Sequence, residues 1–369
     1  MKKAAVLRYI ILTISQMRHE LNIKKTRTNT LRSMVFLAAM LLFSSVAMAQ
    51  LEGQYTQFMF NRLSYNPAYA GSSGSINVFG FYRNQWMGLN LNAPTTGVDA
   101  GSTPTNFMAA VDMPVSWLHG GVGLVVASEE IGYHKNTLLN LDYAFRIVWG
   151  PGTLAAAIEA DLFSGTFDKS NLYGSSDLTG DPTNPTTSGG DPLLNGNNES
   201  SFLIDASTGL YYQIPGTMYV GLSVKNLLAA KSEDLAYQNA RTLYFMGGYE
   251  YTFPYNPSIK IKPSALLKTA DFATLQADVA CLIDYRNFFW AGASYRVTDA
   301  VSLLAGMNID LPEVGQFQVG AAYDLTTSKL GTFKPGRSFG SVELYLKFSF
   351  KIIVPQKPPS SYGNTRYLR

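Results

Sequence analysis

Most of the chain after residue 75 consists of short segments in which apolar and polar side chains alternate. Alternation with a period of two is the pattern of a β-strand, and a tilted strand of about ten residues crosses a bilayer. The apolar faces of these segments carry no charge, whereas the opposite faces repeatedly carry carboxylates and cations. Clear examples are residues 136–148, 154–162, 218–225, 275–284 and 342–351.

The absence of charge on the apolar faces indicates that they face lipid. A Lys or Arg on a lipid face costs about 2–4 kcal/mol at the bilayer midplane. We therefore predict an all-β fold, a transmembrane antiparallel β-barrel of about 14 strands over residues 75–352, closed so that every backbone polar group is paired. The alternative is a large soluble β-sandwich or closed barrel, whose strands alternate as well.

The connections between the segments fall into two kinds. Counted from Ser75, the gaps after even-numbered segments are short and rich in Pro or Gly, whereas the gaps after odd-numbered segments include the long ones. The long gaps are 84–104, 166–201, 228–240 and 327–339, although the odd gaps near 269–272 and 298–300 are short. This asymmetry is typical of outer-membrane barrels, so we predict long external loops, chiefly 84–104 and 166–201.

The first 49 residues have the features of an export signal. The basic residues Lys24, Lys25, Arg27 and Arg32 precede an apolar run from Met34 to Val46, which is followed by Ala47-Met48-Ala49. We predict that residues 1–49 are an N-terminal extension and signal peptide that is removed. The remaining chain has 21 basic and 25 acidic residues, so its net charge is negative and gives no support to nucleic-acid binding. The single cysteine, Cys281, rules out an intrachain disulfide.

Three segments lie outside the predicted strands. Residues 50–74 form a periplasmic N-terminal segment, a candidate plug whose alternative role is to make the turn into the first strand. In the loop 166–201, the spacing of Asp177, Asp181 and Asp191 matches no calcium loop. The tail 353–369 is expected in the periplasm, either as a disordered overhang or as a partner contact.

Catalytic signals are weak. The pattern Gly336-Arg337-Ser338-Phe339-Gly340 matches a nucleophile elbow, which requires a strand before the serine and a helix after it, whereas here a strand follows. The histidines outside the leader, His119 and His134, are remote from Ser338 in sequence. The chain has no CxxC, HExxH or P-loop pattern. We therefore predict a protein that is not an enzyme and holds no cofactor or metal.

Charged residues recur on the polar faces of the predicted strands. They either line a pore or pair with one another in a network that holds a plug. Pairing is favoured, because an isolated charge inside a crowded barrel is costly. The residues are Glu159, Asp161, Asp278 and Asp324, with Arg146, Arg296 and Lys225.

Several short blocks of sequence together resemble one family. They are Gln57-Phe58-Met59-Phe60-Asn61, Asn66-Pro67-Ala68-Tyr69-Ala70-Gly71, Tyr82-Arg83-Asn84-Gln85-Trp86, Pro94-Thr95-Thr96, Gly292-Ala293-Ser294-Tyr295-Arg296, Gly320-Ala321-Ala322-Tyr323-Asp324 and Ser341-Val342-Glu343-Leu344. Through them the chain resembles the PorP/SprF family of outer-membrane proteins from the type IX secretion and gliding system of Bacteroidota. The family commonly has Ser-His-Glu where this chain has Ser341-Val342-Glu343, so a role of that histidine is not carried over.

The resemblance implies a barrel similar to the fatty-acid transporter class and a non-enzymatic component of type IX secretion in a Gram-negative outer membrane. Its expected partners are a secreted adhesin, held by its C-terminal sorting domain, translocon proteins, and periplasmic ring or peptidoglycan-linked lipoproteins. The alternative is an outer-membrane transport channel for a hydrophobic or small polar solute. The residues expected to be structural or to contact a partner are Gln57, Phe58, Phe60, Asn61, Asn66, Pro67, Ala68, Gly71, Tyr82, Arg83, Gln85, Trp86, Tyr295, Arg296, Tyr323, Asp324, Ser341 and Glu343.

Overall fold

The computed structural model describes residues 53–88, 102–167, 199–232, 237–272, 274–328 and 338–352. The predicted leader 1–49 and tail 353–369 lie outside these ranges, as do Pro94-Thr95-Thr96 and most of the loops 84–104 and 166–201. Among the described residues, no helix is both long enough and apolar enough to cross a membrane.

The strands follow the predicted segments closely. In chain order they are β1 (Ile76–Met87), β2 (Ser102–Val115), β3 (Gly120–Gly132), β4 (His134–Trp149), β5 (Gly152–Phe167), β6 (Glu199–Ile214), β7 (Met218–Lys225), β8 (Lys231–Ser232), β9 (Tyr237–Gln238), β10 (Thr242–Tyr249), β11 (Tyr251–Phe253), β12 (Asn256–Ala270), β13 (Thr274–Tyr285), β14 (Phe289–Arg296), β15 (Ala300–Leu311), β16 (Gly315–Thr326) and β17 (Gly340–Phe350). The helices are α2 (Arg62–Tyr65) and the short 3-10 turns η1 (Pro67–Tyr69) and η2 (Ser116–Leu118).

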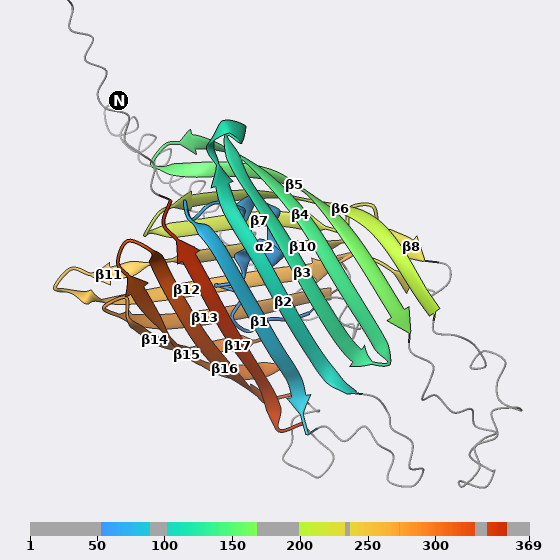
Figure 1. Ribbon diagram of the computed structural model, residues 1–369. Coiled ribbons are helices and arrows are strands. Elements are labelled where there is room, and N and C mark those ends of the chain that lie inside the picture. The colour runs from blue at the N-terminus through green and yellow to red at the C-terminus, as the bar shows by residue number, and fades with distance from the viewer. Residues whose placement is uncertain are drawn as a thin grey trace, which may run out of the picture. The chain divides into compact units, whose positions relative to one another are not determined.

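The strands close into a barrel (Figure 1). Antiparallel neighbours follow one another along the chain, β1 also pairs with β17, and β10 pairs with both β7 and β12. The short strand β11 continues the line of β10 beside β12, and β8 and β9 form a separate hairpin. The described residues therefore form a 14-strand antiparallel barrel, and the predicted fold is confirmed.

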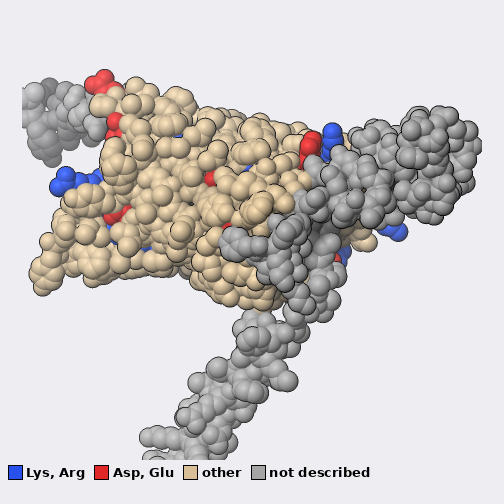
Figure 2. Space-filling model, turned by 90° about the horizontal axis from the view of Figure 1, so that it is seen from below, with Lys and Arg blue, Asp and Glu red and all other residues tan. Residues whose placement is uncertain are grey.

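The alternating faces of the strands lie as predicted. On β4, Leu141 and Phe145 are about half exposed on the outside, whereas Asn140 and Asp142 are buried inside. Figure 2 shows one side of the molecule, on which most of the visible charged side chains lie towards the ends. A continuous apolar outer wall is incompatible with a water-facing barrel but matches lipid.

The long connections lie at one end of the barrel. They join β1 to β2, β5 to β6, β7 to β10 and β16 to β17, and three short connections share that end. The opposite end carries tight turns such as Trp149–Gly152 and Ile214–Met218. We call these the long-connection end and the tight-turn end. The rule for outer-membrane barrels assigns the tight-turn end to the periplasm.

Residues 53–74, which we call the lumen segment, lie inside the barrel. Near their start, the amides of Gln54 and Gln276 pair at 3.0 Å close to the long-connection end. Further along, Asn66 bonds to the backbone of β6, and Gly71 reaches Asp112 near the tight-turn end. The segment therefore runs along the barrel interior towards the tight-turn end and then continues into β1.

Candidate functional site

Arg83 on β1 lies inside the barrel beside two carboxylates. Its Nη2 is 2.7 Å from Asp324 Oδ2 on β16, and its Nη1 is 3.2 Å from Glu343 Oε2 on β17. All three side chains are almost completely buried. Removing any one of the three side chains would leave a buried charge without its partner. An unpaired buried charge is far more costly than a paired one, so the loss would destabilise the barrel.

The same carboxylates hold the lumen segment. Glu343 accepts the backbone N–H groups of Thr56 at 2.7 Å and Gln57 at 2.8 Å, one with each oxygen. The Thr56 hydroxyl donates to Asp324 at 2.8 Å and accepts from Arg83 Nη1 at 3.0 Å. Hydrogen bonds to ionised groups are roughly twice as strong as neutral ones.

Arg296 on β14 extends this cluster around the wall. Its Nε is 3.2 Å from Asp278 Oδ1 on β13, and its Nη1 is 4.0 Å from Asp324 Oδ2. We call the set of Thr56, Arg83, Asp278, Arg296, Asp324 and Glu343 the Arg83 network. It joins β1, β17 and three further strands on the β17 side to one short stretch of the lumen segment.

A second set of contacts holds the segment near the tight-turn end. Arg146 on β4 donates to the carbonyl oxygens of Ala68 at 3.3 Å, Tyr69 at 2.9 Å and also Ala70. Asp112 accepts the N–H of Gly71 at 2.9 Å. Gly71 has a φ of +68°, and a Cβ there would lie 2.7 Å from the Met113 carbonyl oxygen. Only glycine fits this position without strain.

Asn66 fixes the middle of the segment. Its Oδ1 accepts the N–H of Ala68 at 2.9 Å, which caps the turn η1, and its Nδ2 donates to the Leu210 carbonyl at 2.9 Å. The wall opposite is shaped for it, since a Cβ on Gly209 would lie 2.2 Å from Asn66 Oδ1.

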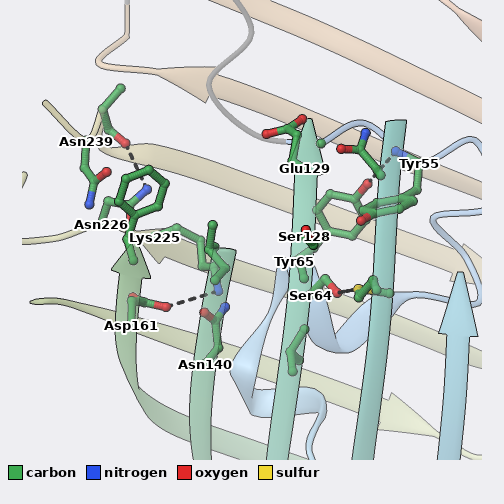
Figure 3. Close-up of a pocket in the computed structure, with 18 residues that line it drawn as sticks. Tyr55, Ser64, Tyr65, Ser128, Glu129, Asn140, Asp161, Lys225, Asn226 and Asn239 are labelled. Carbon is green, nitrogen blue, oxygen red and sulfur yellow. Dashed lines mark hydrogen bonds and ion pairs between the residues drawn. The ribbon is translucent and has the colours of Figure 1, made fainter. Parts of the chain in front are cut away.

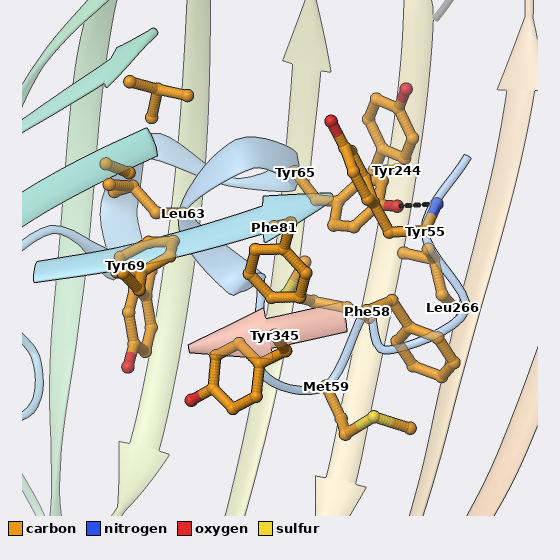
Figure 4. Close-up of a cluster of buried hydrophobic side chains, with 14 of the residues drawn as sticks. Tyr55, Phe58, Met59, Leu63, Tyr65, Tyr69, Phe81, Tyr244, Leu266 and Tyr345 are labelled. Carbon is orange, nitrogen blue, oxygen red and sulfur yellow. Dashed lines mark hydrogen bonds between the residues drawn. The ribbon is translucent and has the colours of Figure 1, made fainter. Parts of the chain in front are cut away.

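Aromatic side chains fill the space between the segment and the wall (Figure 4). Tyr65 packs against Tyr244 with ring centroids 5.3 Å apart, and Phe60 stacks on Tyr345 at 5.0 Å. The Tyr65 hydroxyl accepts the N–H of Tyr55 at 3.2 Å, and burial raises the pKa of that hydroxyl, so it stays protonated. Such pairs contribute about 0.5–1.5 kcal/mol each beyond simple burial.

The charges predicted on the polar strand faces do pair with one another. Lys225 contacts Glu159 and lies 3.7 Å from Asp161, while Arg296 bonds to Asp278. Arg146 instead bonds to backbone carbonyls of the lumen segment. The prediction of paired charges is confirmed for Lys225 and Arg296 but not for Arg146.

The family blocks divide into inner and outer residues. The buried ones are Gln57, Phe58, Asn61, Asn66, Pro67, Ala68, Gly71, Arg83, Gln85, Arg296, Asp324, Ser341 and Glu343, while Phe60 and Trp86 are partly exposed. The tyrosines beside the network residues point the other way: Tyr82, Tyr295 and Tyr323 are 38–47% exposed on the outer face. Aromatic side chains are common on the outer face near barrel ends.

Two residues of these blocks shape the strand at the long-connection end. The β1–β17 register shifts between Asn84 and Met87, and Trp86 has a φ of +55°. The Trp86 N–H donates to the Ser341 hydroxyl at 3.0 Å. Between Ser341 and Glu343, which are buried, Val342 is partly exposed on the opposite face. A histidine at this position would therefore point away from the Arg83 network.

Ser338, the serine of the nucleophile-elbow pattern, bonds to its own loop. Its hydroxyl accepts the N–H of Gly340 at 2.9 Å and donates to the Gly340 carbonyl at 3.3 Å. His119 follows η2 at the tight-turn end, whereas Ser338 precedes β17 at the long-connection end. The described residues form no group of three or more His, Cys, Asp or Glu side chains that could hold a metal.

Several residues that hold the structure were missed in the sequence. Thr56 and Arg62 belong to the lumen segment, and Asp112 contacts it from β2. Asp205 holds the connection between β7 and β10. Asp205 accepts the N–H groups of Leu228 at 2.8 Å and Ala230 at 2.9 Å. Asp112 and Asp205 were detectable as carboxylates on polar strand faces, but the lumen segment has no periodicity from which a contact could be predicted.

A cavity of about 90 Å³ lies between the lumen segment and the wall (Figure 3). Tyr55 and Tyr65 border it on the segment side, and Met108 and Phe163 line the wall. Asn140, which also lines it, has a buried Oδ1 without a hydrogen-bond partner among the described residues.

A closed antiparallel barrel with an apolar outer wall and a polar interior defines an integral outer-membrane protein. The family model of the type IX secretion system membrane protein PorP/SprF matches residues 47–348, which include the lumen segment and nearly all of the barrel. The chain belongs to this family and is an outer-membrane component of type IX secretion. No curated protein sequence matches it.

Solved structures with a similar fold include three transporters or channels. The toluene transporter TbuX of Ralstonia pickettii is 12% identical, with a TM-score of 0.42 over 78% of this chain and 92% of that one. The P. putida toluene transporter TodX is 10% identical, with a TM-score of 0.44 over 78% and 92%. The monoaromatic hydrocarbon channel CymD is 12% identical, with a TM-score of 0.44 over 83% and 95%. The likeness concerns the fold alone.

Proposed function

We propose that this protein is a non-enzymatic anchor that holds a secreted adhesin by its C-terminal sorting domain at the long-connection end. The proposal places it in the outer membrane of a Bacteroidota-like bacterium, exported by the signal peptide predicted over residues 1–49. Periplasmic ring or peptidoglycan-linked lipoproteins and other translocon proteins are the proposed partners at the tight-turn end. The same proposal includes a role for this protein in gliding motility.

The observation that carries the proposal is the filled interior. The lumen segment is fixed near both ends by charged groups, the buried Arg83 and Glu343 at one end and the partly buried Arg146 at the other. Aromatic packing occupies the middle. An interior held in this way acts as a plug and supports a fixed platform more readily than an open pore.

The described long-connection end also offers a shaped surface. Asp205 and Asn239 hold the connection between β7 and β10, with Asn239 Nδ2 3.1 Å from Asp205 Oδ2. On this connection Leu228 is 64% exposed. Burial of this exposed leucine side chain against an apolar patch of a partner domain is favourable.

Pull-down with the tagged full-length barrel from cells that make the adhesin tests the proposal. Recovery of the adhesin's C-terminal domain is expected, and Leu228→Glu should reduce it. The matched control is Tyr255→Glu, a fully exposed position in the tight turn before β12 at the opposite end. Absence of the domain from the wild-type eluate would refute the anchor.

A transport channel for a hydrophobic or small polar solute is the second candidate. It is favoured by the cavity beside Tyr55 and Tyr65, which combines apolar wall residues with the unpartnered Asn140 Oδ1. Conductance and uptake after reconstitution separate the two functions. A plugged anchor shows neither, whereas a channel shows at least one and shows it without any adhesin present.

A further inference from the structure

Arg62 and Lys347 lie near the tight-turn end of the barrel interior, and neither forms an ion pair with a described carboxylate. Arg62 on the lumen segment donates through Nε to the Met59 carbonyl at 2.9 Å and through Nη1 to the Tyr211 hydroxyl at 3.2 Å. Within the described ranges, no carboxylate lies within 4.0 Å of its guanidinium, which instead stacks 3.8 Å from the Tyr219 ring centre. Lys347 on β17 forms no hydrogen bond or ion pair with any residue in those ranges.

Both cations face one cavity. It has a volume of about 270 Å³, and it is lined by Arg62, Lys347 and Lys262 among charged groups and by Tyr69, Tyr219 and Gln318 among polar ones. Its lining also includes residues of the turn between β6 and β7, so the cavity lies towards the tight-turn end.

The carboxylates nearby are already engaged. Glu250, the acidic residue among those that line the cavity, lies 2.7 Å from Lys260 and 3.9 Å from Lys262. Asp284 Oδ2 forms an ion pair with Lys262 Nζ at 2.8 Å. Asp112, whose charge acts on Lys347, accepts bonds from Gly71 and Asn77. Arg62 and Lys347, which form no ion pair with a described carboxylate, therefore give the lining of this cavity an excess of positive charge.

We infer that this cavity is a binding site for an oxyanion, a phosphate or carboxylate group, held between Arg62 and Lys347. Cations removed from bulk water without counter-ions are costly, and a bound anion removes that cost. The planar guanidinium offers a free Nη2, and the ammonium offers three donors, so both suit an oxyanion. Apolar neighbours such as Met59 and Leu282 accommodate an organic body attached to the anion.

Two sources supply this chemistry at the periplasmic end: a soluble phosphate or carboxylate, and the headgroup of an anionic lipid. Inorganic phosphate is the first probe, titrated by calorimetry into the full-length barrel in nanodiscs of phosphatidylcholine. Nanodiscs that contain phosphatidylglycerol provide the second probe. Saturable phosphate binding identifies a soluble ligand, whereas lipid that co-purifies with the barrel and blocks phosphate identifies a headgroup.

Arg62→Gln and Lys347→Gln each remove one cation, and each should weaken binding by at least about tenfold. Lys351→Gln is the matched control, because Lys351 is exposed beyond the end of β17 and does not line the cavity. Without phosphate, the unfolding midpoint of Lys347→Gln should equal or exceed that of the wild type, since this substitution leaves no described carboxylate unpaired. Binding of neither probe, or equal binding by all variants, overturns the inference. This outcome is independent of adhesin capture.

Discussion

Single residues decide how the lumen segment meets the wall. Gly71 and Glu343 act in different ways: Gly71 allows close backbone approach, and Glu343 supplies two charged acceptors. Gly71 also belongs to a pair with Gly74, since both have a positive φ but only Gly71 is crowded. The pair makes it possible to separate conformational strain from steric contact.

Gly71→Ala should destabilise the protein by about 2–4 kcal/mol, because the new Cβ meets backbone 2.7 Å away in addition to the cost of a positive φ. Gly74→Ala, with nothing within 4 Å, should cost only about 1 kcal/mol. Equilibrium unfolding in urea measures both. Equal losses would show that Gly71 is not in close contact with Met113.

Glu343→Gln should loosen the start of the lumen segment. One of its two acceptors becomes a donor that faces an N–H group, and Arg83 loses part of its counter-charge. Amide hydrogen exchange at Thr56 and Gln57 should accelerate by about tenfold or more, which corresponds to roughly 1.4 kcal/mol. Glu130→Gln serves as the control, because Glu130 is half exposed in a 3.8 Å pair with Lys135. Unchanged exchange in Glu343→Gln would contradict the proposed contacts.

At the scale of elements, the strands could be predicted from the sequence, but the side-chain contacts between distant strands could not. The pattern in β4 placed Leu141 outside and Asp142 inside because a period of two is a local property. The contacts of Arg83 with Asp324 and Glu343 depend on the closure of β1 on β17, which joins residues about 260 apart in the sequence. Thr56 and Arg62 lie in irregular chain, where no period indicates direction.

A charge on the outer face of a strand tests the lipid contact. Leu141→Lys, near the middle of β4, should cost about 2–4 kcal/mol, whereas Ile147→Lys, on the same face near the end of the strand, should cost about 0–1 kcal/mol. Assembly into heat-modifiable outer-membrane protein should therefore fall for the first variant and stay near wild type for the second. Full assembly of Leu141→Lys would favour a soluble barrel.

At the scale of the whole molecule, the lumen segment and the barrel wall form one packed interior. In a Cys281→Ser background, Gln54→Cys combined with Gln276→Cys should give an intrachain cross-link with a short bis-maleimide, because the two amides are 3.0 Å apart. Gln54→Cys with Gln318→Cys is the control, since Gln318 lines the cavity near the tight-turn end. Electrophoretic mobility reports the product. The reverse pattern would mean that the segment enters from the other end.

The position of the lumen segment directly before β1 has a consequence for biogenesis. Arg83 lies on the first strand and Glu343 on the last strand, and both side chains form hydrogen bonds with Thr56 of the segment. The pairing of β1 with β17 therefore brings Arg83 and Glu343 together, and the binding of Thr56 requires the same two side chains. We expect the barrel to close around its own N-terminal segment, so that the final zipping of the wall and the filling of its interior occur as one cooperative folding step.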